Sequence, residues 1–519
     1  MKLSAVLWVS FALAFALRPA AQIATSQYDN LRTNATLQEK TLTPQNVNAR
    51  QFGKLGSFKV DGAVFAQPLF MPGLEIPGKG KHNVLFVATE HDSVYAFDAD
   101  RPNDMPLWHV NFLGGKASTV PADSVQCPFI EPEVGITSTP ALDTKTGTLY
   151  VLARTRISSL TSDRYLQHLH ALAVTTGVEK FGGPRLITAT APGRGAGGSG
   201  GLVRFDPLVE NPRASLLLAN NTLYLAWASS CDWGPYHGWV MAYDAHTLAQ
   251  RAALNVTPDG EEGGIWLSDT GIAADSAGNV YVPTGNGTFD AASGGRDYGD
   301  SLLKLQLAGG RFSVADYFTP HDQAKLSSDD ADLGSSGPLL LPDQPGPHRH
   351  LLLQPSKGGM IYVVDRDRMG KFQSSGDAVV QEFRTGEGYG AMAYWNGHVF
   401  FAASDDALRD YAVKGGRLLP GGHSVIQFEN PGATPAVSAN GARNGIVWAV
   451  ATKTWNGQNR AAVLYAFDAA SLTQPIYTSE QNSRRDHAAL ATRFVVPVVV
   501  NGRVYFGARG EVEVYGLLK

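Results

Sequence analysis

The sequence predicts an all-β protein built as one eight-bladed β-propeller. Two β-rich runs joined by a polar turn recur eight times along the 519 residues, and the clearest copy pairs residues 84–88 with residues 94–98. The second run returns at 169–172, 240–244, 302–305, 361–365, 410–413, 464–468 and 512–515. A strand couplet that repeats at intervals of roughly fifty to seventy-five residues is typical of radial or solenoid architectures. Four strands per couplet give eight blades, or seven if one couplet is not a blade.

Composition agrees with a large β protein and excludes some partners. Hydrophobic residues make up 44% of the chain and charged residues 17%, which suits a sizeable core, and 56 glycines with 29 prolines supply many tight turns. The formal net charge is -4 and the chain has no basic run, which argues against nucleic acid as a partner. A small-molecule substrate or a partner protein remains.

The N-terminus resembles an export signal. Lys2 precedes an apolar run at residues 3–17, and Pro19-Ala20-Ala21 follows, so we expect residues 1–21 to direct export to the periplasm or the extracellular space. No later segment is apolar enough to cross a bilayer, so no membrane span is expected after signal removal. Residues 22–59 form an N-terminal segment, and residues 60–519 form the propeller. Within this arrangement residues 50–62 are the candidate for a strand that completes the last blade and closes the ring.

Cys127 and Cys231 are the only two cysteines. An even number in an exported protein predicts one disulfide, with two buried free thiols as the alternative. A bond between them would close a loop of about a hundred residues and contribute about 4–5 kcal/mol in the chain-entropy description. Neither cysteine belongs to a haem-attachment or zinc-binding spacing.

Several polar or aromatic side chains occupy two kinds of loop that share one face of a propeller. Asp232, Asn286 and Lys357 each follow the second strand of a blade, whereas Trp266 and Asp332 precede first strands. In a four-stranded meander, these two connections emerge at the same end of the blades. The sequence therefore predicts that the five side chains converge near the axis.

Residues 260–372 resemble the pyrroloquinoline-quinone (PQQ) dependent alcohol dehydrogenases, the quinoproteins related to methanol dehydrogenase. The resemblance rests on four short segments: Gly264-Ile265-Trp266, Tyr281-Val282-Pro283-Thr284-Gly285-Asn286, Tyr317-Phe318-Thr319-Pro320-His321-Asp322 and the run at 357–366 that begins Lys357-Gly358-Gly359. The couplet repeat extends a weaker resemblance, at the level of the fold, over residues 64–519.

The resemblance implies a set of roles. Asn286 and Asp232 would bind a calcium ion, which prefers hard oxygen ligands. Asp332 would be the catalytic base that takes the alcohol proton. Lys357 would contact the quinone and stabilise the charge that develops on it, and Trp266 would stack on the planar cofactor. The implied activity is oxidation of an alcohol or a sugar with PQQ and calcium.

The sequence also departs from the family. The dehydrogenases carry two adjacent cysteines that form a disulfide ring over the cofactor, and this chain has none. The acidic insert at 327–332 offers Asp330 as well as Asp332 for the base. Asp and Asn are also common turn residues. The alternative function is therefore a non-catalytic binding or scaffold propeller that has lost the cofactor.

Overall fold

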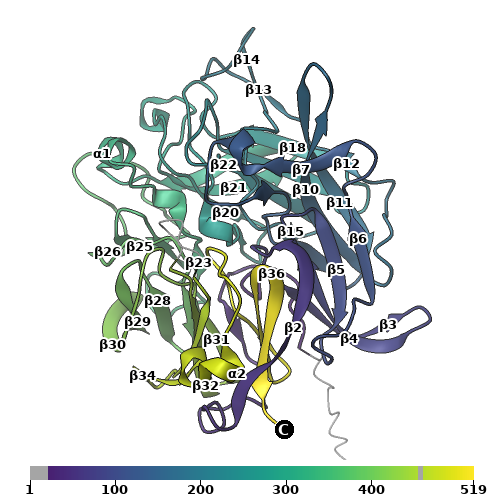
Figure 1. Cartoon of the computed structure of the whole chain (residues 1–519). Coiled ribbons are helices and arrows are strands. Elements are labelled where there is room, and N and C mark those ends of the chain that lie inside the picture. The colour runs from purple at the N-terminus through teal and green to yellow at the C-terminus, as the bar shows by residue number, and fades with distance from the viewer. Residues whose placement is uncertain (1–20, 454–459) are drawn as a thin grey trace, which may run out of the picture.

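The computed structural model describes residues 21–453 and 460–519, so nearly all of the expected export signal lies outside the described residues. Within this part of the chain, eight antiparallel sheets stand in a ring, which confirms the eight-bladed propeller and excludes the seven-bladed alternative (Figure 1). The alternating apolar residues of the couplets form the strands, and each blade buries them against its neighbours. No helix in the described residues is long and apolar enough to span a bilayer.

The first four blades follow the chain order. Their strands are β3 (Leu69–Ile76), β4 (Gly80–Ala88), β5 (Ser93–Asp98) and β6 (Trp108–Asn111); β9 (Ala141–Asp143), β10 (Thr148–Ser158), β11 (Asp163–Ala173) and β12 (Arg185–Leu186); β15 (Leu217–Ala219), β16 (Thr222–Trp227), β17 (Trp239–Asp244) and β18 (Gln250–Asn255); and β19 (Ala273–Ala274), β20 (Val280–Pro283), β21 (Leu302–Ala308) and β22 (Arg311–Phe318). Two inserts add further strands. The first contains β7 (Ala117–Pro121), which pairs with the extended end of β10, and β8 (Glu133–Val134), which pairs with β7; the second is the separate hairpin of β13 (Thr190–Pro192) and β14 (Leu202–Arg204).

The next three blades repeat the same meander. Their strands are β23 (Leu339–Leu340), β24 (Leu351–Pro355), β25 (Met360–Asp365) and β26 (Gln381–Arg384); β27 (Ala393–Trp395), β28 (His398–Ala402), β29 (Asp406–Lys414) and β30 (Arg417–Phe428); and β31 (Ala436–Asn440), β32 (Arg443–Ala451), β33 (Val463–Asp468) and β34 (Ser471–Thr478), beside which β1 (Ala35–Thr36) adds a short parallel strand. The helices are short: α1 (Gln323–Ser328), α2 (Ser483–Asp486) and the 3-10 turns Ala122–Val125, Leu267–Asp269, Ala291–Ser293, Leu333–Ser335 and Ser479–Asn482.

The eighth blade joins the two ends of the described chain. It contains β35 (Val498–Val500), β36 (Arg503–Leu517) and β2 (Phe52–Ala63). A Cβ at Gly516 would lie 3.1 Å from the Gly502 carbonyl oxygen, so the two ends of β36 lie side by side and the strand folds back on itself. The purple β2 runs beside the yellow β36, with Phe52 opposite Leu517 (Figure 1). Antiparallel pairing between the N-terminal and C-terminal segments thus closes the ring.

The N-terminal segment also crosses the inside of the ring, a feature that the sequence pattern did not predict. Backbone N–H groups of the innermost strands donate to carbonyl oxygens of this segment in blade after blade: Phe70 to Ile23, Leu142 to Ala24, Ala274 to Asn30, Leu340 to Leu31, Tyr394 to Thr33 and Val437 to Asn34. The fully buried Arg32 guanidinium donates to the Ile272 carbonyl (2.9 Å) and to the Ser26 carbonyl (2.7 Å). Residues 23–34, which we term the channel segment, therefore tie the inner strands together.

Candidate functional site

A cavity of about 270 Å³ lies where the loops of several blades meet. Of the residues predicted from the sequence, Asp232, Trp266, Asp332 and Lys357 line it, and so does the alternative acid Asp330. Ser268 and Ser335, in the 3-10 turns before β19 and β23, also line the cavity, and the channel segment bonds to Ala274 and Leu340 in the strands that follow those turns. The channel segment therefore lies deeper in the ring than the cavity.

Lys357 lies between two aspartates. Its Nζ is 2.6 Å from Asp330 Oδ1 and 3.5 Å from Asp332 Oδ2. The turn after β24 carries the lysine, and the loop before β23 carries both acids. Backbone bonds hold the two loops together, because Lys357 N donates to the Asp332 carbonyl (3.0 Å) and Gly358 N donates to the Ala331 carbonyl (3.2 Å). Main-chain bonds therefore fix the turn from which the Lys357 ammonium reaches both acids.

Asp332 is the most perturbed carboxyl group of the cavity wall. Only 5% of the residue is exposed, and this burial raises the pKa of its carboxyl from 3.8 to about 7. Lys357 and the Asn286 N–H lower the pKa, whereas the charges of Asp232 and Asp330 raise it further. A carboxyl group that titrates near neutral pH at the wall of a cavity has the property that a general base needs.

Asn286 connects the two aspartates from a neighbouring blade. Its backbone N–H donates to Asp332 Oδ1 (2.9 Å), and its side-chain Nδ2 donates to Asp330 Oδ1 (2.9 Å). Its Oδ1 is buried and has no hydrogen-bond partner in the described part of the chain. Gly285 is required before it, because a Cβ there would collide with Asp332 Oδ1 and lie 2.8 Å from the Trp266 ring. The Thr-Gly-Asn turn thus packs directly beneath the acid.

Asp232 lies at the open side of the cavity and is accessible to solvent. The Tyr236 hydroxyl donates to its Oδ1 (2.8 Å). Partial removal from water raises the pKa of this carboxyl, the Tyr236 bond lowers it, and the charge of Asp330 raises it again. Both Cys231 (φ 51°) and Asp232 (φ 54°) adopt left-handed backbone conformations, which are strained for residues with a side chain.

The predicted disulfide is present and belongs to the same site. Cys127 and Cys231 are bonded, 104 residues apart in sequence, and Cys231 lines the cavity next to Asp232. The bond ties the insert that carries Phe129 to the loop that carries Asp232. This disulfide joins cysteines far apart in sequence, unlike the ring of two adjacent cysteines found in the dehydrogenases, but its Cys231 lines the same cavity as the candidate residues.

Trp266 completes the deep wall. It is 8% exposed, its ring packs edge-on against Tyr236 at a centroid distance of 6.1 Å, and its Nε1 is buried without a hydrogen-bond partner among the described residues. An unpaired buried N–H and the unpaired Asn286 Oδ1 are costly unless a ligand or water satisfies them. Both therefore point to an occupant of polar character.

The donor chemistry fits a cation and an anionic cofactor better than an empty apolar pocket. Asp330 and Asp332 pair with the Lys357 ammonium and accept hydrogen bonds from Asn286, whose amide oxygen is unpaired, and Asp232 lines the same cavity. Oxygen donors of this kind suit calcium, which takes six to eight ligands and would draw the remainder from a cofactor and water. Within the described residues no three His, Cys, Asp or Glu side chains gather closely enough to hold a metal unaided.

Sequence reasoning missed the outer wall of the cavity. Arg213, Tyr389 and Phe494 line it, as does Phe129 from the insert before blade two. The first three precede the first strands β15, β27 and β35, in the same type of loop as Trp266 and Asp332. Applying that loop rule to every blade would have found them. Arg213 lies over the Phe494 ring at 5.1 Å, and Arg493 lies over Phe129 at 3.6 Å.

Comparison with solved structures shows which known proteins share this fold. The fold matches the quinohemoprotein alcohol dehydrogenase ADHIIG of Pseudomonas putida HK5 with a TM-score of 0.60 and 13% identity over 96% of this chain and 80% of the other. It matches the quinohemoprotein alcohol dehydrogenase of Comamonas testosteroni with a TM-score of 0.61 and 15% identity over 95% and 80%. A europium-containing methanol dehydrogenase matches with a TM-score of 0.57 and 13% identity over 96% and 98%.

These matches show a propeller of the quinoprotein dehydrogenase type, and they confirm the predicted resemblance at the level of the fold. No family model matches the chain, and no curated protein matches it in sequence. Which ligand and which reaction belong to this particular chain must therefore be argued from its own site.

Proposed function

We propose that this chain is an exported oxidoreductase that uses PQQ and a calcium ion to oxidise an alcohol or a sugar. The observation that carries the proposal is the shared cavity of Asp232, Trp266, Asp332 and Lys357 in a propeller of the quinoprotein type. The buried and unpaired Asn286 Oδ1 beside this cavity supports a ligand that is a hard cation.

The residues present suggest how such a cofactor would be held. Trp266 would pack on the planar rings, Lys357 would bind a quinone oxygen, and Asp232 with Asn286 would hold the calcium ion. When bound, the quinone supplies a two-electron acceptor and the calcium ion supplies a Lewis acid. The protein contributes orientation and a preorganised charge pattern.

Asp332 is the better candidate for the base. Its carboxyl is buried and has a pKa of about 7, whereas the Asp330 side chain is 60% exposed and is held by both Lys357 and Asn286. Ionised Asp332 would accept the hydroxyl proton of the substrate. Its ionised fraction rises with pH through about 7, so the rate should rise over the same range.

Export is supported by chemistry in addition to the N-terminal pattern. The Cys127–Cys231 bond requires an oxidising environment to form and persist, as found in the periplasm or outside the cell. The disulfide and residues 1–21 thus point to the same compartment.

A second candidate is a non-catalytic binding or scaffold propeller. One observation favours it: both acids at the centre of the site already have partners within the protein. Lys357 pairs with Asp330 and Asp332, and Asn286 donates hydrogen bonds to both. Such a network is stable without a cofactor. The absence of the adjacent-cysteine ring agrees with this alternative.

Calorimetry on the purified protein with PQQ and calcium, followed by dye reduction with alcohols and aldoses, tests the proposal. We expect saturable binding and turnover, with Asp332→Asn retaining binding and losing turnover. The exposed neighbour Asp329, which pairs with Lys325, provides the control Asp329→Asn with turnover unchanged. Absence of binding at high micromolar PQQ contradicts the proposed oxidoreductase function. Binding without turnover in the wild type favours the non-catalytic binding propeller.

A further inference from the structure

The cavity that Asp332 and Lys357 line is termed here the quinone-type cavity. A second and larger hollow lies away from it, between three adjacent blades. Its volume is about 660 Å³, and it is bounded by β22, by the end of β25 with the loop that follows it, and by the start of β30. We term it the interblade groove. Its size lies within the range of small-molecule sites, and its lining is rich in polar side chains.

The charges in this groove are unbalanced. Arg368, Lys371 and Arg417 line it, all three are exposed, and no acidic partner is found for any of them within the described residues. Two acids also line the groove: Asp316 accepts the Met369 N–H (2.9 Å), and Asp365 lies 2.8 Å from His348 Nδ1. Three cations against two carboxylates leave the lining with an excess of positive charge, on a protein whose overall charge is -4.

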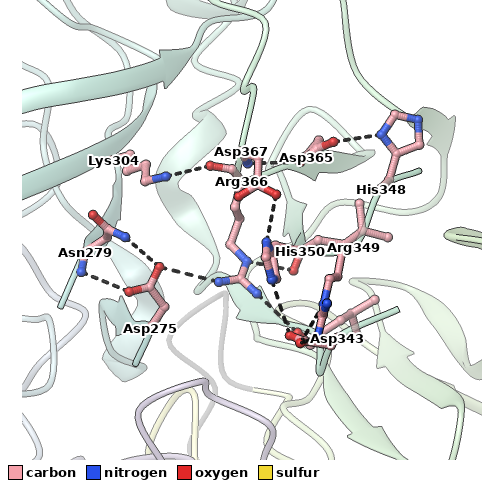
Figure 2. A network of polar contacts seen from close by, with 12 residues as sticks. Asp275, Asn279, Lys304, Asp343, His348, Arg349, His350, Asp365, Arg366 and Asp367 are labelled. Carbon is pink, nitrogen blue, oxygen red and sulfur yellow. Dashed lines mark hydrogen bonds and ion pairs between the residues drawn. The ribbon is translucent and has the colours of Figure 1, made fainter. Parts of the chain in front are cut away.

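A polar network beside the groove engages Asp365 and its two neighbours in structural contacts (Figure 2). In the run Asp365-Arg366-Asp367-Arg368, the first three side chains are committed to structural contacts. Arg366 is buried and lies 3.6 Å from Asp275, and Asp367 Oδ2 pairs with His350 Nδ1 (2.7 Å). Within the described part of the chain the Arg368 side chain has no such contact, and it lines the groove together with Asp365.

The backbone fixes the position of Lys371. Its φ of 57° is left-handed, a conformation that glycine adopts with less strain than lysine. Two hydrogen bonds hold it there, from Lys371 N to the Tyr317 carbonyl (2.9 Å) and from Thr319 N to the Lys371 carbonyl (3.3 Å). The main chain therefore holds the Cα of Lys371 beside β22, and its exposed side chain lines the groove.

We propose that the interblade groove binds a small ligand that carries at least two carboxylate or phosphate groups. Arg368 and Arg417 line the groove from different blades, and their planar guanidinium groups can bind such oxyanions in a bidentate manner. Lys371 adds a third positive charge to the same lining. His348 stands at the edge of the same groove. This site does not depend on the proposed oxidoreductase function.

The test is calorimetric titration of the full chain with citrate and with pyrophosphate, in calcium-free buffer of low ionic strength. The groove variant Arg368→Gln/Lys371→Gln/Arg417→Gln is compared with a control of equal charge change, Arg50→Gln/Lys116→Gln/Arg443→Gln, whose residues are exposed elsewhere. We expect binding to the wild type that weakens with salt, a loss of roughly tenfold or more in the groove variant, and a change within about twofold in the control.

The pattern of binding identifies the ligand chemistry. Preference for citrate indicates a carboxylate ligand, and preference for pyrophosphate indicates a phosphate ligand. The proposal is overturned if the wild type binds neither probe at millimolar concentration, or if the control variant loses as much affinity as the groove variant. Circular dichroism of each variant confirms that it is folded.

Discussion

Replacing Asp332 by Asn should remove a pH-dependent cost of folding. Burial raises the pKa of this carboxyl from 3.8 to about 7, which makes its ionisation in the folded protein harder by at most about 4 kcal/mol. The folded state binds the proton more tightly than the unfolded state, so Asp332 contributes most stability below pH 3.8. That stability is lost as the pH rises through about 7.

The magnitude can be worked out for two convenient conditions. With the carboxyl pKa at 3.8 unfolded and about 7 folded, ionisation costs the wild type roughly 2 to 3 kcal/mol between pH 5 and pH 8. Asn has no such titration, and its amide oxygen can still accept the Asn286 N–H that Asp332 accepts. The Asp332→Asn variant should therefore gain this amount relative to the wild type as the pH is raised.

Urea unfolding of both proteins at pH 5 and pH 8 measures the difference. The exposed acid Asp329, which is paired with Lys325, offers a matched control, since Asp329→Asn should keep the wild-type slope over this range. A difference between wild type and Asp332→Asn that is equal at the two pH values would refute the reasoning, because it would show that Asp332 is ionised throughout.

Four further changes test other parts of the structure. Lys357→Met removes the ammonium that lowers the Asp332 pKa, so the pH-dependent loss of stability should extend to higher pH. Lys325→Met, at the exposed pair with Asp329, should leave the pH dependence of stability unchanged. Urea unfolding at several pH values measures both variants. Cys127→Ser/Cys231→Ser should cost about 4–5 kcal/mol, because the bond closes a loop of about a hundred residues, and an unchanged urea midpoint in the double variant would contradict this. Phe52→Ala should cost about 3–5 kcal/mol, since this buried ring packs on Trp448, Tyr477 and Tyr515 where β2 closes the ring, and a loss below about 1 kcal/mol would mean that closure contributes little. Arg32→Met should cost about 2–4 kcal/mol by leaving the Ser26 and Ile272 carbonyls without a donor, and a variant with an unchanged melting temperature would show that the channel segment is dispensable.

The propeller could be predicted because its signal is local. Alternation of apolar and polar residues decides which face of a strand is buried, and a turn decides where the strand ends, so runs such as residues 94–98 and 361–365 identify their strands without knowledge of distant contacts. The same reasoning placed Asp232 and Lys357 in second-to-third strand loops, and the folded chain brings both to one cavity.

The site was only partly predictable, because its chemistry depends on burial and on neighbours from other blades. The sequence left Asp330 and Asp332 open as bases. Only the packing of Asp332 against Gly285, with Asn286 and Lys357 around it, separates a carboxyl of pKa about 7 from its exposed neighbour. Distance in sequence hides such contacts, since Asn286 and Asp332 belong to successive blades.

By itself, then, the amino-acid order determined the strand couplets, their eightfold recurrence and the resemblance to the quinoproteins, and it favoured a disulfide over two free thiols. The tertiary structure alone decided the path of the channel segment, the arginine and aromatic wall of the cavity, and the gathering of three cations in the interblade groove. The physical reason is range. Strand patterns come from steric and solvation preferences of neighbouring residues, whereas a buried charge or an unpaired cation is defined by groups that only ring closure brings together.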